Sequence, residues 1–430
     1  MKINENPNRD LWPSLTERPV RKAEDLDKII SAIFDEVQKK GDKALRAYTE
    51  QFDRVKLDDF RVNSAEIESA GDALSTALKE AIVLAKNNIE IFHASQLTGK
   101  NVVKTTVGVS CWQEMRPIEK VGLYIPGGTA PLFSTILMLG IPAKLAGCKE
   151  VVLCTPPNTK GSVDPAILYT AGLLGIESVY KVGGAQAIAA MTYGTASIPK
   201  VYKIFGPGNQ FVTAAKQFAL NKGVAIDMPA GPSELMVVAD SNAKASFVAS
   251  DLLSQAEHGA DSQVICITDT VQKLEEIKRE LSVQLANLPR KDTAQLAIDN
   301  SQFLVLESLQ DRIDFINEYA PEHLILNVVD ESLYLDKIIN SGSVFIGPYT
   351  PESAGDYASG TNHTLPTNSY ARMYSGVNMD AFTKKITFQK ISREGIQQIG
   401  EAIELMAEAE GLQAHKNAVS LRLQDIKDNE

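Results

Sequence analysis

Apolar residues return every three or four positions over two stretches near the start of the chain. The stretches run from about residue 23 to 50 and from 64 to 93, and this period predicts amphipathic helices. Ser64 is placed to cap the second of these stretches. Residues 1–20 are polar, contain proline and lack a clear period, so we expect an arm there rather than a domain.

From Val121 the pattern changes to short apolar runs that alternate with turns and helical stretches. Strands are expected at residues 121–126, 151–155, 178–182, 201–205, 235–239, 262–268, 303–306, 324–326 and 343–347. Their alternation with helices predicts an α/β fold with parallel sheets. Residues 348–380 form a long irregular segment, of the kind usually kept for function, and two helices follow from Ser392 to about Arg422.

One helix end in the second half of the chain carries a group of polar side chains. Apolar residues at helical spacing between 245 and 256 place one face of this helix in a core. Gln255 and His258 are three residues apart, and therefore lie on the same side of the chain. Gly259 is expected to cap the helix. The pair is a candidate ligand site between a helix end and the next strand.

Composition narrows the possible partners. The chain has 430 residues, enough for two or more domains, and its net charge is −11 with 43 basic and 54 acidic residues. This balance argues against nucleic acid or an anionic membrane as the main partner. No apolar run reaches the roughly 18 residues that a membrane span needs, and residues 1–7 have no signal core. The four cysteines, none in a C-x-x-C motif, are expected to be reduced and mostly buried, which predicts a cytoplasmic protein: Cys111, Cys148, Cys154 and Cys266.

The five histidines are His93, His258, His323, His363 and His415. His93 falls late in a helical stretch, where a structural role is expected. Three of the others sit at element ends near carboxylates, and for the set a functional role is favoured. Glu322 and His323 form a candidate acid/base pair, because imidazole titrates near neutral pH and a carboxylate can handle a second proton. Both side chains can reach one site only at a bend, which Pro321 makes plausible.

Two kinds of ligand site stay open on residue patterns alone. Gln255, His258, Asp356 and His415 could offer two nitrogens and two oxygens to one cation, a set that suits zinc, with manganese and iron as alternatives. Spacing along the sequence does not show that Asp356 and His415 lie near Gln255 and His258. The glycine turns at 125–129 and 205–209 are phosphate candidates, but neither matches G-x-G-x-x-G. A dinucleotide site and simple tight turns are both compatible with them.

Eight motifs, in order along nearly the whole chain, resemble those of the histidinol dehydrogenase family. They are Tyr124-Ile-Pro-Gly-Gly, Gly183-Gly-Ala-Gln-Ala, Gly206-Pro-Gly-Asn, Pro229-Ala-Gly-Pro-Ser-Glu, Gln255-Ala-Glu-His, Ala320-Pro-Glu-His-Leu, Gly355-Asp-Tyr-Ala-Ser-Gly-Thr-Asn-His and Glu410-Gly-Leu-Gln-Ala-His. The resemblance implies a zinc-dependent, four-electron oxidation of L-histidinol through L-histidinal to L-histidine, with two NAD per turnover. It also implies a homodimer whose tail reaches the partner's site.

Residue roles follow from the same resemblance. Zinc would be held by Gln255, His258, Asp356 and His415. Substrate would contact Ser233, Gln255, His258, His323, Asp356, Glu410 and His415. NAD would contact Tyr124, Gln186 and Asn209. His323 would take the alcohol proton and Glu322 would activate water on the aldehyde; a cysteine hemithioacetal at Cys111 or Cys154 is the rival route.

The implied fold is two incomplete Rossmann-like parallel-sheet domains with an N-terminal arm and a helical C-terminal tail. The expected divisions are an arm at 1–22, a first α/β domain at 23–120 and 235–380, a second Rossmann-like domain at 121–234, and a helical dimerisation tail at 381–430. A zinc-binding scaffold without activity, or a dehydrogenase of another polar amino alcohol, is the alternative function.

Overall fold

The computed structural model describes residues 3–18, 26–127 and 131–429. The chain forms two compact units, one made of residues 1–96 and 118–382 and the other of residues 97–117 and 383–430. In the described part of the chain, no helix is long and apolar enough to span a bilayer. The predicted boundary near residue 22 lies outside the described residues.

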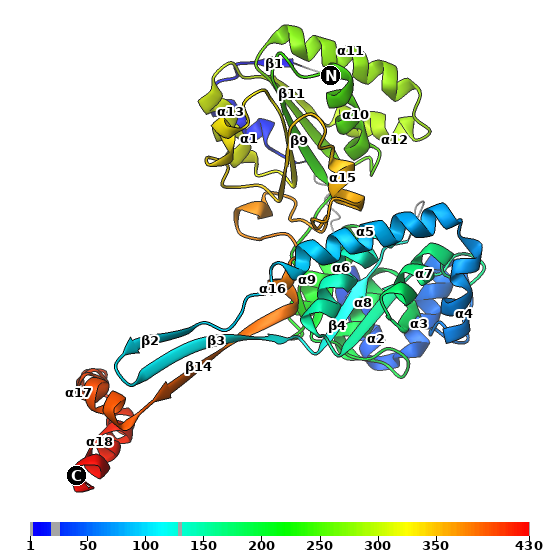
Figure 1. Ribbon diagram of the computed structural model, residues 1–430. Helices are drawn as coiled ribbons and strands as arrows, with labels where there is room; N and C mark the ends of the chain where they lie inside the picture. The colour runs from blue at the N-terminus through cyan, green and yellow to red at the C-terminus, as the bar shows by residue number, and fades with distance from the viewer. Residues whose placement is uncertain (1–2, 19–25, 128–130, 430) are drawn as a thin grey trace. The chain divides into compact units, whose positions relative to one another are not determined.

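The first unit contains a six-stranded parallel sheet with helices on both faces (Figure 1). Its strands, in spatial order, are β1 (Ile3–Glu5), β11 (Gln302–Val305), β10 (Gln263–Thr268), β9 (Glu234–Ala239), β12 (His323–Asn327) and β13 (Ser343–Ile346). Its helices include α1 (Trp12–Leu15), α10 (Ala245–Ala256), α11 (Val271–Ala286), α12 (Lys291–Asp299), α13 (Leu309–Tyr319) and α14 (Ser332–Leu335). Val237 packs with α10 and α11 while its neighbour Met236 packs with α1 and α13, so both faces of β9 are core.

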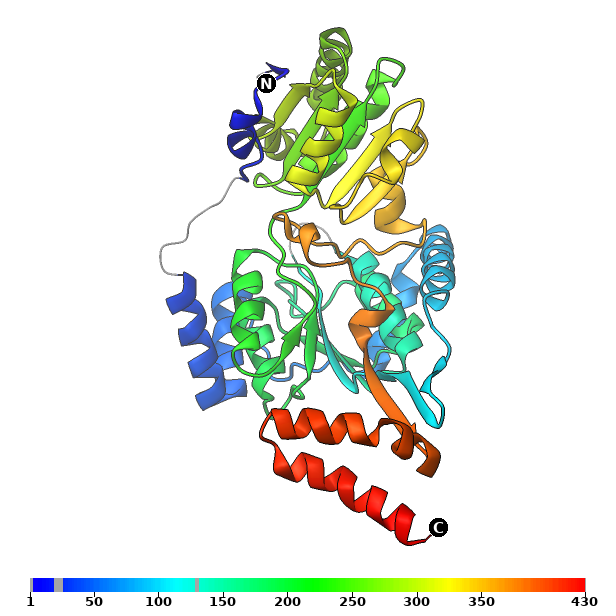
Figure 2. The same ribbon diagram turned by 90° about the vertical axis from the view of Figure 1, so that its left-hand side faces the viewer.

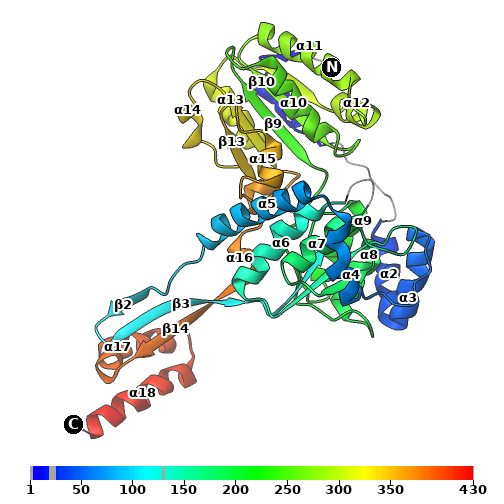
Figure 3. The ribbon, with the colours of Figure 1, turned by 45° about the vertical axis from the view of Figure 1, so that its right-hand side comes forward.

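A second parallel sheet of five strands lies in the same unit (Figure 3). Its strands, in spatial order, are β6 (Ser178–Lys181), β5 (Glu150–Thr155), β4 (Lys120–Tyr124), β7 (Lys203–Phe205) and β8 (Ala225–Ile226). The connecting helices are α6 (Phe133–Ala146), α7 (Pro165–Leu173), α8 (Gly184–Tyr193) and α9 (Gln210–Leu220). The predicted α/β class with two parallel sheets is confirmed.

The helices that precede β4 pack on the five-stranded sheet's helices. They are α2 (Leu26–Lys40), α3 (Asp42–Tyr48), α4 (Ser64–Ser69) and α5 (Thr76–Ala94). Helix α2 contacts α8 and α9, α4 contacts α7, and α5 contacts α6. Phe34, for example, shares a core with Ile188 and Ala215. This differs from the predicted grouping of residues 23–120 with 235–380, because an apolar helix face does not reveal which of two sheets it covers.

Three helix ends differ from the predictions in detail. The predicted helix over 23–50 is divided at Gly41, which has a φ of 54°. The next helix is capped by Asn63 rather than Ser64, since the Asn63 side chain accepts from the Glu66 amide and the Glu66 side chain accepts from the Asn63 amide. Helix α10 is capped by Glu257 in the right-handed region, so Gly259 does not have the predicted capping role.

The second unit is a three-stranded antiparallel sheet followed by a helical hairpin. Its strands are β2 (Val102–Thr106), β3 (Val109–Pro117) and β14 (Thr383–Ile391), with β3 in the centre. Helices α17 (Arg393–Ala409) and α18 (Gln413–Asp428) pack side by side (Figure 2). The predicted tail at 381–430 therefore includes a strand, and it pairs with residues 109–117 that were expected in the first α/β domain.

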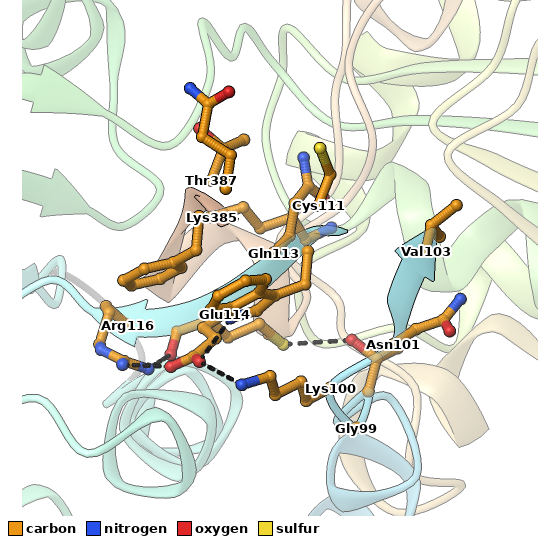
Figure 4. A pocket seen from close by; sticks show the side chains of 15 residues that line it. Gly99, Lys100, Asn101, Val103, Cys111, Gln113, Glu114, Arg116, Lys385 and Thr387 are labelled. Carbon is orange, nitrogen blue, oxygen red and sulfur yellow. Dashed lines mark hydrogen bonds and ion pairs between the residues drawn. The ribbon is translucent and has the colours of Figure 1, made fainter. Parts of the chain in front are cut away.

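A hollow of about 910 Å³ lies over this antiparallel sheet (Figure 4). The Trp112 and Phe388 rings stack at 5.5 Å between centroids, and the Lys100 ammonium lies 4.3 Å from the Trp112 ring. Glu114 accepts from the Trp112 indole at 2.8 Å and pairs with Lys100 and Arg116. Of the candidate residues from the sequence, only Cys111 lines this hollow.

Candidate active site

Glu322 and His323 lie at the start of β12, at the amino edge of the six-stranded sheet. Ala320 has a left-handed backbone with a φ of 54°, and together with Pro321 it makes the bend that the sequence suggested. Both side chains are buried, and His323 Nδ1 is 3.6 Å from Glu322 Oε2. The bend therefore lets two sequence neighbours, which would diverge in a regular strand, reach one place.

The backbone of Glu234, at the start of β9, fixes both members of this pair. Its amide donates to Glu322 Oε2 at 2.8 Å, and its carbonyl oxygen lies 3.2 Å from His323 Nδ1. With the proton on Nδ1 donated to that carbonyl, the lone pair of His323 is on Nε2. His323 Nε2 is buried and has no hydrogen-bond partner within the described residues. The imidazole thus presents a free basic nitrogen.

Burial decides the charge of the pair. It lowers the pKa of His323 to about 3, so the imidazole is neutral at pH 7. Burial also raises the pKa of Glu322 well above its ordinary value, and the nearby carboxylates of Glu234, Glu352 and Asp356 raise it further. The unprotonated imidazole can accept a proton from a substrate, and the Glu322 carboxyl can accept one from water only at a pH where it has ionised.

Three of the potential metal ligands gather beside His323. The ligand atoms of His258, Glu352 and Asp356 all lie within 4.8 Å of one another. Asp356 Oδ1 is 3.8 Å from His323 Nε2, and Glu352 Oε1 is 3.8 Å from His323 Nδ1. The predicted ligands His258 and Asp356 are therefore brought together, although about a hundred residues separate them in the chain.

Gln255 adds an unused oxygen to this group. Its side chain is fully buried, its amide nitrogen lies 3.4 Å from His258 Nδ1, and its Oε1 lacks a partner within the described residues. An orphaned buried acceptor is costly unless a ligand completes it. Nitrogen and oxygen donors without thiolate suit zinc, and manganese or iron less well. The residues present fit a bound cation.

Glu352 was not among the predicted site residues. It lies on α15 (Glu352–Tyr357), is 1% exposed, and its Oε1 has no hydrogen-bond partner among the described residues. Burial raises the pKa of Glu352 and of Asp356, and raises the pKa of the neighbouring Asp251 to about 7. The i, i+4 spacing of Glu352 and Asp356 on one helix face was the available signal. So many buried carboxyls favour a cation among them.

Two other polar residues flank the cluster. Ser233 is half-buried immediately before β9, and its carbonyl oxygen accepts from the Gln263 amide at 3.3 Å. His363 Nδ1 lies 3.0 Å from the Asp356 carbonyl oxygen, and its Nε2 lies 3.2 Å from Thr135 Oγ1 on α6. Burial lowers the pKa of His363 to about 4. Both nitrogens of His363 are engaged, so it orients the Asp356 segment against α6.

The three predicted NAD contacts line one cavity of about 940 Å³ at the carboxyl edge of the five-stranded sheet. Tyr124 ends β4, Gln186 is in the first turn of α8, and Asn209 caps α9 by accepting from the amides of Phe211 and Val212. The Tyr124 hydroxyl accepts from the Gly184 amide at 3.0 Å. The volume is in the range of nucleotide and drug-sized ligands.

The glycine turns have different roles around this cavity. Gly206 has a φ of 130°, and a Cβ there would lie 2.1 Å from the Tyr124 carbonyl oxygen. This turn therefore requires glycine for a close backbone approach. Gly127 lines the cavity. Residues 128–130 of the first predicted glycine turn lie outside the described residues.

Comparison with known proteins decides the family. A family model described as histidinol dehydrogenase matches residues 16–423. The chain belongs to the histidinol dehydrogenase family. It is 54% identical to histidinol dehydrogenase from Bacteroides thetaiotaomicron over 427 residues, which covers 99% of this chain and 100% of that protein. The protein of the same name from Mannheimia succiniciproducens is 51% identical, over 97% of this chain and 99% of that protein.

A solved structure supports the same assignment. The crystal structure of histidinol dehydrogenase from Elizabethkingia anophelis matches with a TM-score of 0.98 and 58% identity, over 99% of each chain. The resemblance that the eight motifs carry is confirmed, and with it the predicted class: an NAD-dependent oxidoreductase of histidine biosynthesis.

The remaining predicted residues of the histidinol dehydrogenase site lie in the second unit. Glu410 follows α17 and His415 is in the first turn of α18, and both are exposed. Their contacts with substrate, and the place of His415 among the metal ligands, stay predictions.

The cysteines are mostly buried and reduced, as predicted for small apolar side chains. All four are free; Cys148, Cys154 and Cys266 are buried and Cys111 is partly exposed. Burial raises the pKa of the Cys154 thiol well above its ordinary value, which disfavours the thiolate that a hemithioacetal route needs.

His93 has the predicted structural role, since its Nδ1 lies 2.8 Å from the Ile89 carbonyl oxygen and its Nε2 lies 3.3 Å from the Asn362 side-chain amide nitrogen.

Proposed function

We propose that the chain oxidises L-histidinol through L-histidinal to L-histidine, using zinc and two NAD. Family membership supports the substrate and product. The observation that supports the mechanism is the neutral imidazole of His323, whose unpartnered Nε2 lies 3.8 Å from Asp356 Oδ1, an atom of the candidate metal-ligand group. A base beside a cation is an arrangement that can support alcohol oxidation, since the base takes the hydroxyl proton and the cation orients a polar substrate.

Gln255, His258 and Asp356 would hold the metal, with His415 as the fourth ligand. The unpartnered Oε1 of Gln255 and the grouping of His258 with Asp356 support three of these four assignments. Glu352 is a further anionic group within reach of the same cation. When bound, zinc supplies a Lewis acid and a template that orients a polar substrate.

His323 and Glu322 would handle the protons of the two oxidations. In the first, His323 Nε2 takes the hydroxyl proton of the alcohol as the carbon loses a hydride, which NAD accepts when bound in its cavity. In the second, Glu322 takes a proton from the water that adds to the aldehyde carbon, and the anionic hydrate that results loses a second hydride to give the carboxylic acid. Each oxidation removes one hydride and one proton, so the four electrons leave with two NADH.

Ser233, Glu410 and His415 would complete the substrate site, and the last two belong to the unit that we propose to act in a homodimer. The site would then be finished by the partner's tail. The four free cysteines are in keeping with the predicted cytoplasmic location, where thiols stay reduced.

The stoichiometry of the reaction tests the proposal directly. Purified zinc-loaded protein given limiting L-histidinol and excess NAD is expected to form two NADH per histidinol consumed, with L-histidine as product. If histidinol is not consumed, but another polar amino alcohol gives one NADH per molecule and an aldehyde or ketone product, the alternative dehydrogenase would be favoured. No turnover with zinc bound would favour a scaffold without activity.

The cavity also predicts the choice of cofactor. Asp53 and Asp164 are among its described lining residues, and none of those residues is basic. Burial raises the pKa of Asp53 to about 6, so the carboxylate is charged at pH 8 and would repel the additional ribose phosphate that distinguishes NADP from NAD. We expect kcat/KM with NAD to exceed that with NADP by at least about a hundredfold at pH 8. Asp53→Asn should narrow this gap; an unchanged gap would remove Asp53 from cofactor selection.

A further inference from the structure

Arg18, in the N-terminal arm, makes an unusually complete set of hydrogen bonds. Its Nε donates to Glu234 Oε1 and its Nη2 to Glu234 Oε2, both at 3.0 Å. Nη2 also donates to the Tyr319 carbonyl oxygen at 2.7 Å. Nη1 donates to Ser369 Oγ at 2.7 Å and to the Thr16 carbonyl oxygen at 3.1 Å. All five N–H groups of the guanidinium are therefore used.

The guanidinium also lies over an aromatic ring. Its Cζ is 3.7 Å from the centroid of the Tyr319 ring, and the Tyr319 hydroxyl donates to Gln263 Oε1 at 2.8 Å. The side chain of Arg18 is 12% exposed and that of Glu234 only 2%. This is a buried bidentate ion pair, whose geometry lysine cannot reproduce because it lacks the planar fork.

Glu234 links this ion pair to the acid/base residues. Its side chain is held by Arg18 and by the Asn368 amide, which donates to Oε1 at 2.8 Å. Its own backbone amide and carbonyl are the groups that contact Glu322 Oε2 and His323 Nδ1. A movement of Glu234 would therefore displace both Glu322 and His323 at once.

We propose that Arg18 and Glu234 are positioning residues for the oxidation, in that the arm's guanidinium fixes Glu234 and Glu234 in turn orients Glu322 and His323. This inference rests on the proposed function of the acid/base pair. Neither residue touches the reacting atoms. Their effect is on geometry: the Glu234 carbonyl selects the tautomer that leaves Nε2 of His323 basic, and the Glu234 amide aims the Glu322 carboxylate.

Variants of Arg18 test the inference against a matched arginine of the same arm. Arg9 pairs with Asp311 at 2.5 Å and Asp314 at 2.6 Å on α13, so Arg9→Met also loosens the arm but does not touch Glu234. The full chain is loaded with zinc, and kcat per bound zinc and KM for NAD are measured with histidinol as substrate. We expect Arg18→Met to lower kcat about ten- to a hundredfold with KM for NAD unchanged.

Two further variants separate positioning from a loss of folding. Arg18→Lys keeps the charge and is expected to recover part of the loss, which keeps the test usable if Arg18→Met does not fold. The double variant Arg18→Met/Glu234→Gln is expected to lose no more than Arg18→Met alone, because both changes act through one link. Arg9→Met should keep the kcat of the natural chain.

The results that would overturn the inference are distinct from those that would overturn the proposed function. If the natural chain forms no NADH from histidinol, the proposed function fails. If it does, and Arg18→Met keeps full kcat per zinc, the inference alone fails. An equal loss of kcat in Arg9→Met would assign the effect to the arm as a whole. A loss of kcat in the double variant that clearly exceeds the loss in Arg18→Met would show that Arg18 does not act through Glu234.

Discussion

Replacing His323 with asparagine is expected to abolish histidinol oxidation while the metal stays bound. Asparagine can still donate to the Glu234 carbonyl, but it offers no basic nitrogen where His323 Nε2 lies unpartnered. Loss of a general base costs about 10²- to 10⁴-fold in rate. We therefore expect kcat, measured as NADH formation, to fall by about a hundred- to ten-thousandfold. The zinc content is measured on the same sample.

His258→Asn is the matched variant on the metal side. His258 groups with Glu352 and Asp356, and its replacement should remove zinc and activity together. The two histidine variants should thus share a loss of turnover and differ in metal content. If His323→Asn also loses its zinc, His323 is a ligand and the assignment of the base to it is wrong.

Glu322→Gln is expected to stop the reaction after the first oxidation. Glutamine keeps the size of the side chain and can still accept from the Glu234 amide, but it cannot take a proton from water. His323 would still serve the first step. We expect overall kcat to fall by about a hundredfold or more, and the NADH formed per histidinol to fall from two toward one. A carbonyl trap such as semicarbazide should capture the aldehyde.

The pH profile gives this prediction a second readout. Because burial and neighbouring carboxylates raise the pKa of Glu322, its basic form is gained only as the pH rises, and overall turnover should increase from neutral toward alkaline pH. His323, with a pKa of about 3, is already neutral throughout that range and adds no limb there. Glu322→Gln should lose the rise. Glu318→Gln, a surface carboxylate variant on α13, should keep both the rise and the ratio of two.

The regular elements were predictable where one face or both faces are buried. The expected strand at 262–268 is β10 at Gln263–Thr268, because its apolar run lies between two helical layers. Strands β2 and β3 were not expected. All five residues of β2 are exposed, so no alternation of apolar and polar positions reports its pairing.

The site was predictable only as far as local spacing and motif resemblance reach. Gln255 and His258 follow from their spacing on one turn, whereas Asp356 was joined to them through resemblance to a family. Arg18 was missed because its partner Glu234 lies 216 residues away. The Arg18–Glu234 ion pair is buried, but the arm has no periodic pattern of apolar residues that would indicate burial of Arg18.

The division of the chain into interleaved segments sets an order for folding during synthesis. All strands of the five-stranded sheet lie between residues 120 and 226, so this sheet can form while the ribosome is still translating later codons. By contrast, β1 pairs with β11, and β3 pairs with β14. The nascent arm must therefore wait for residues 302–305. Strand β3 can pair with β2 at once, but its other edge must wait for residues 383–391. Chaperone protection matters most during that interval, when unpaired edges of strands are open to other chains.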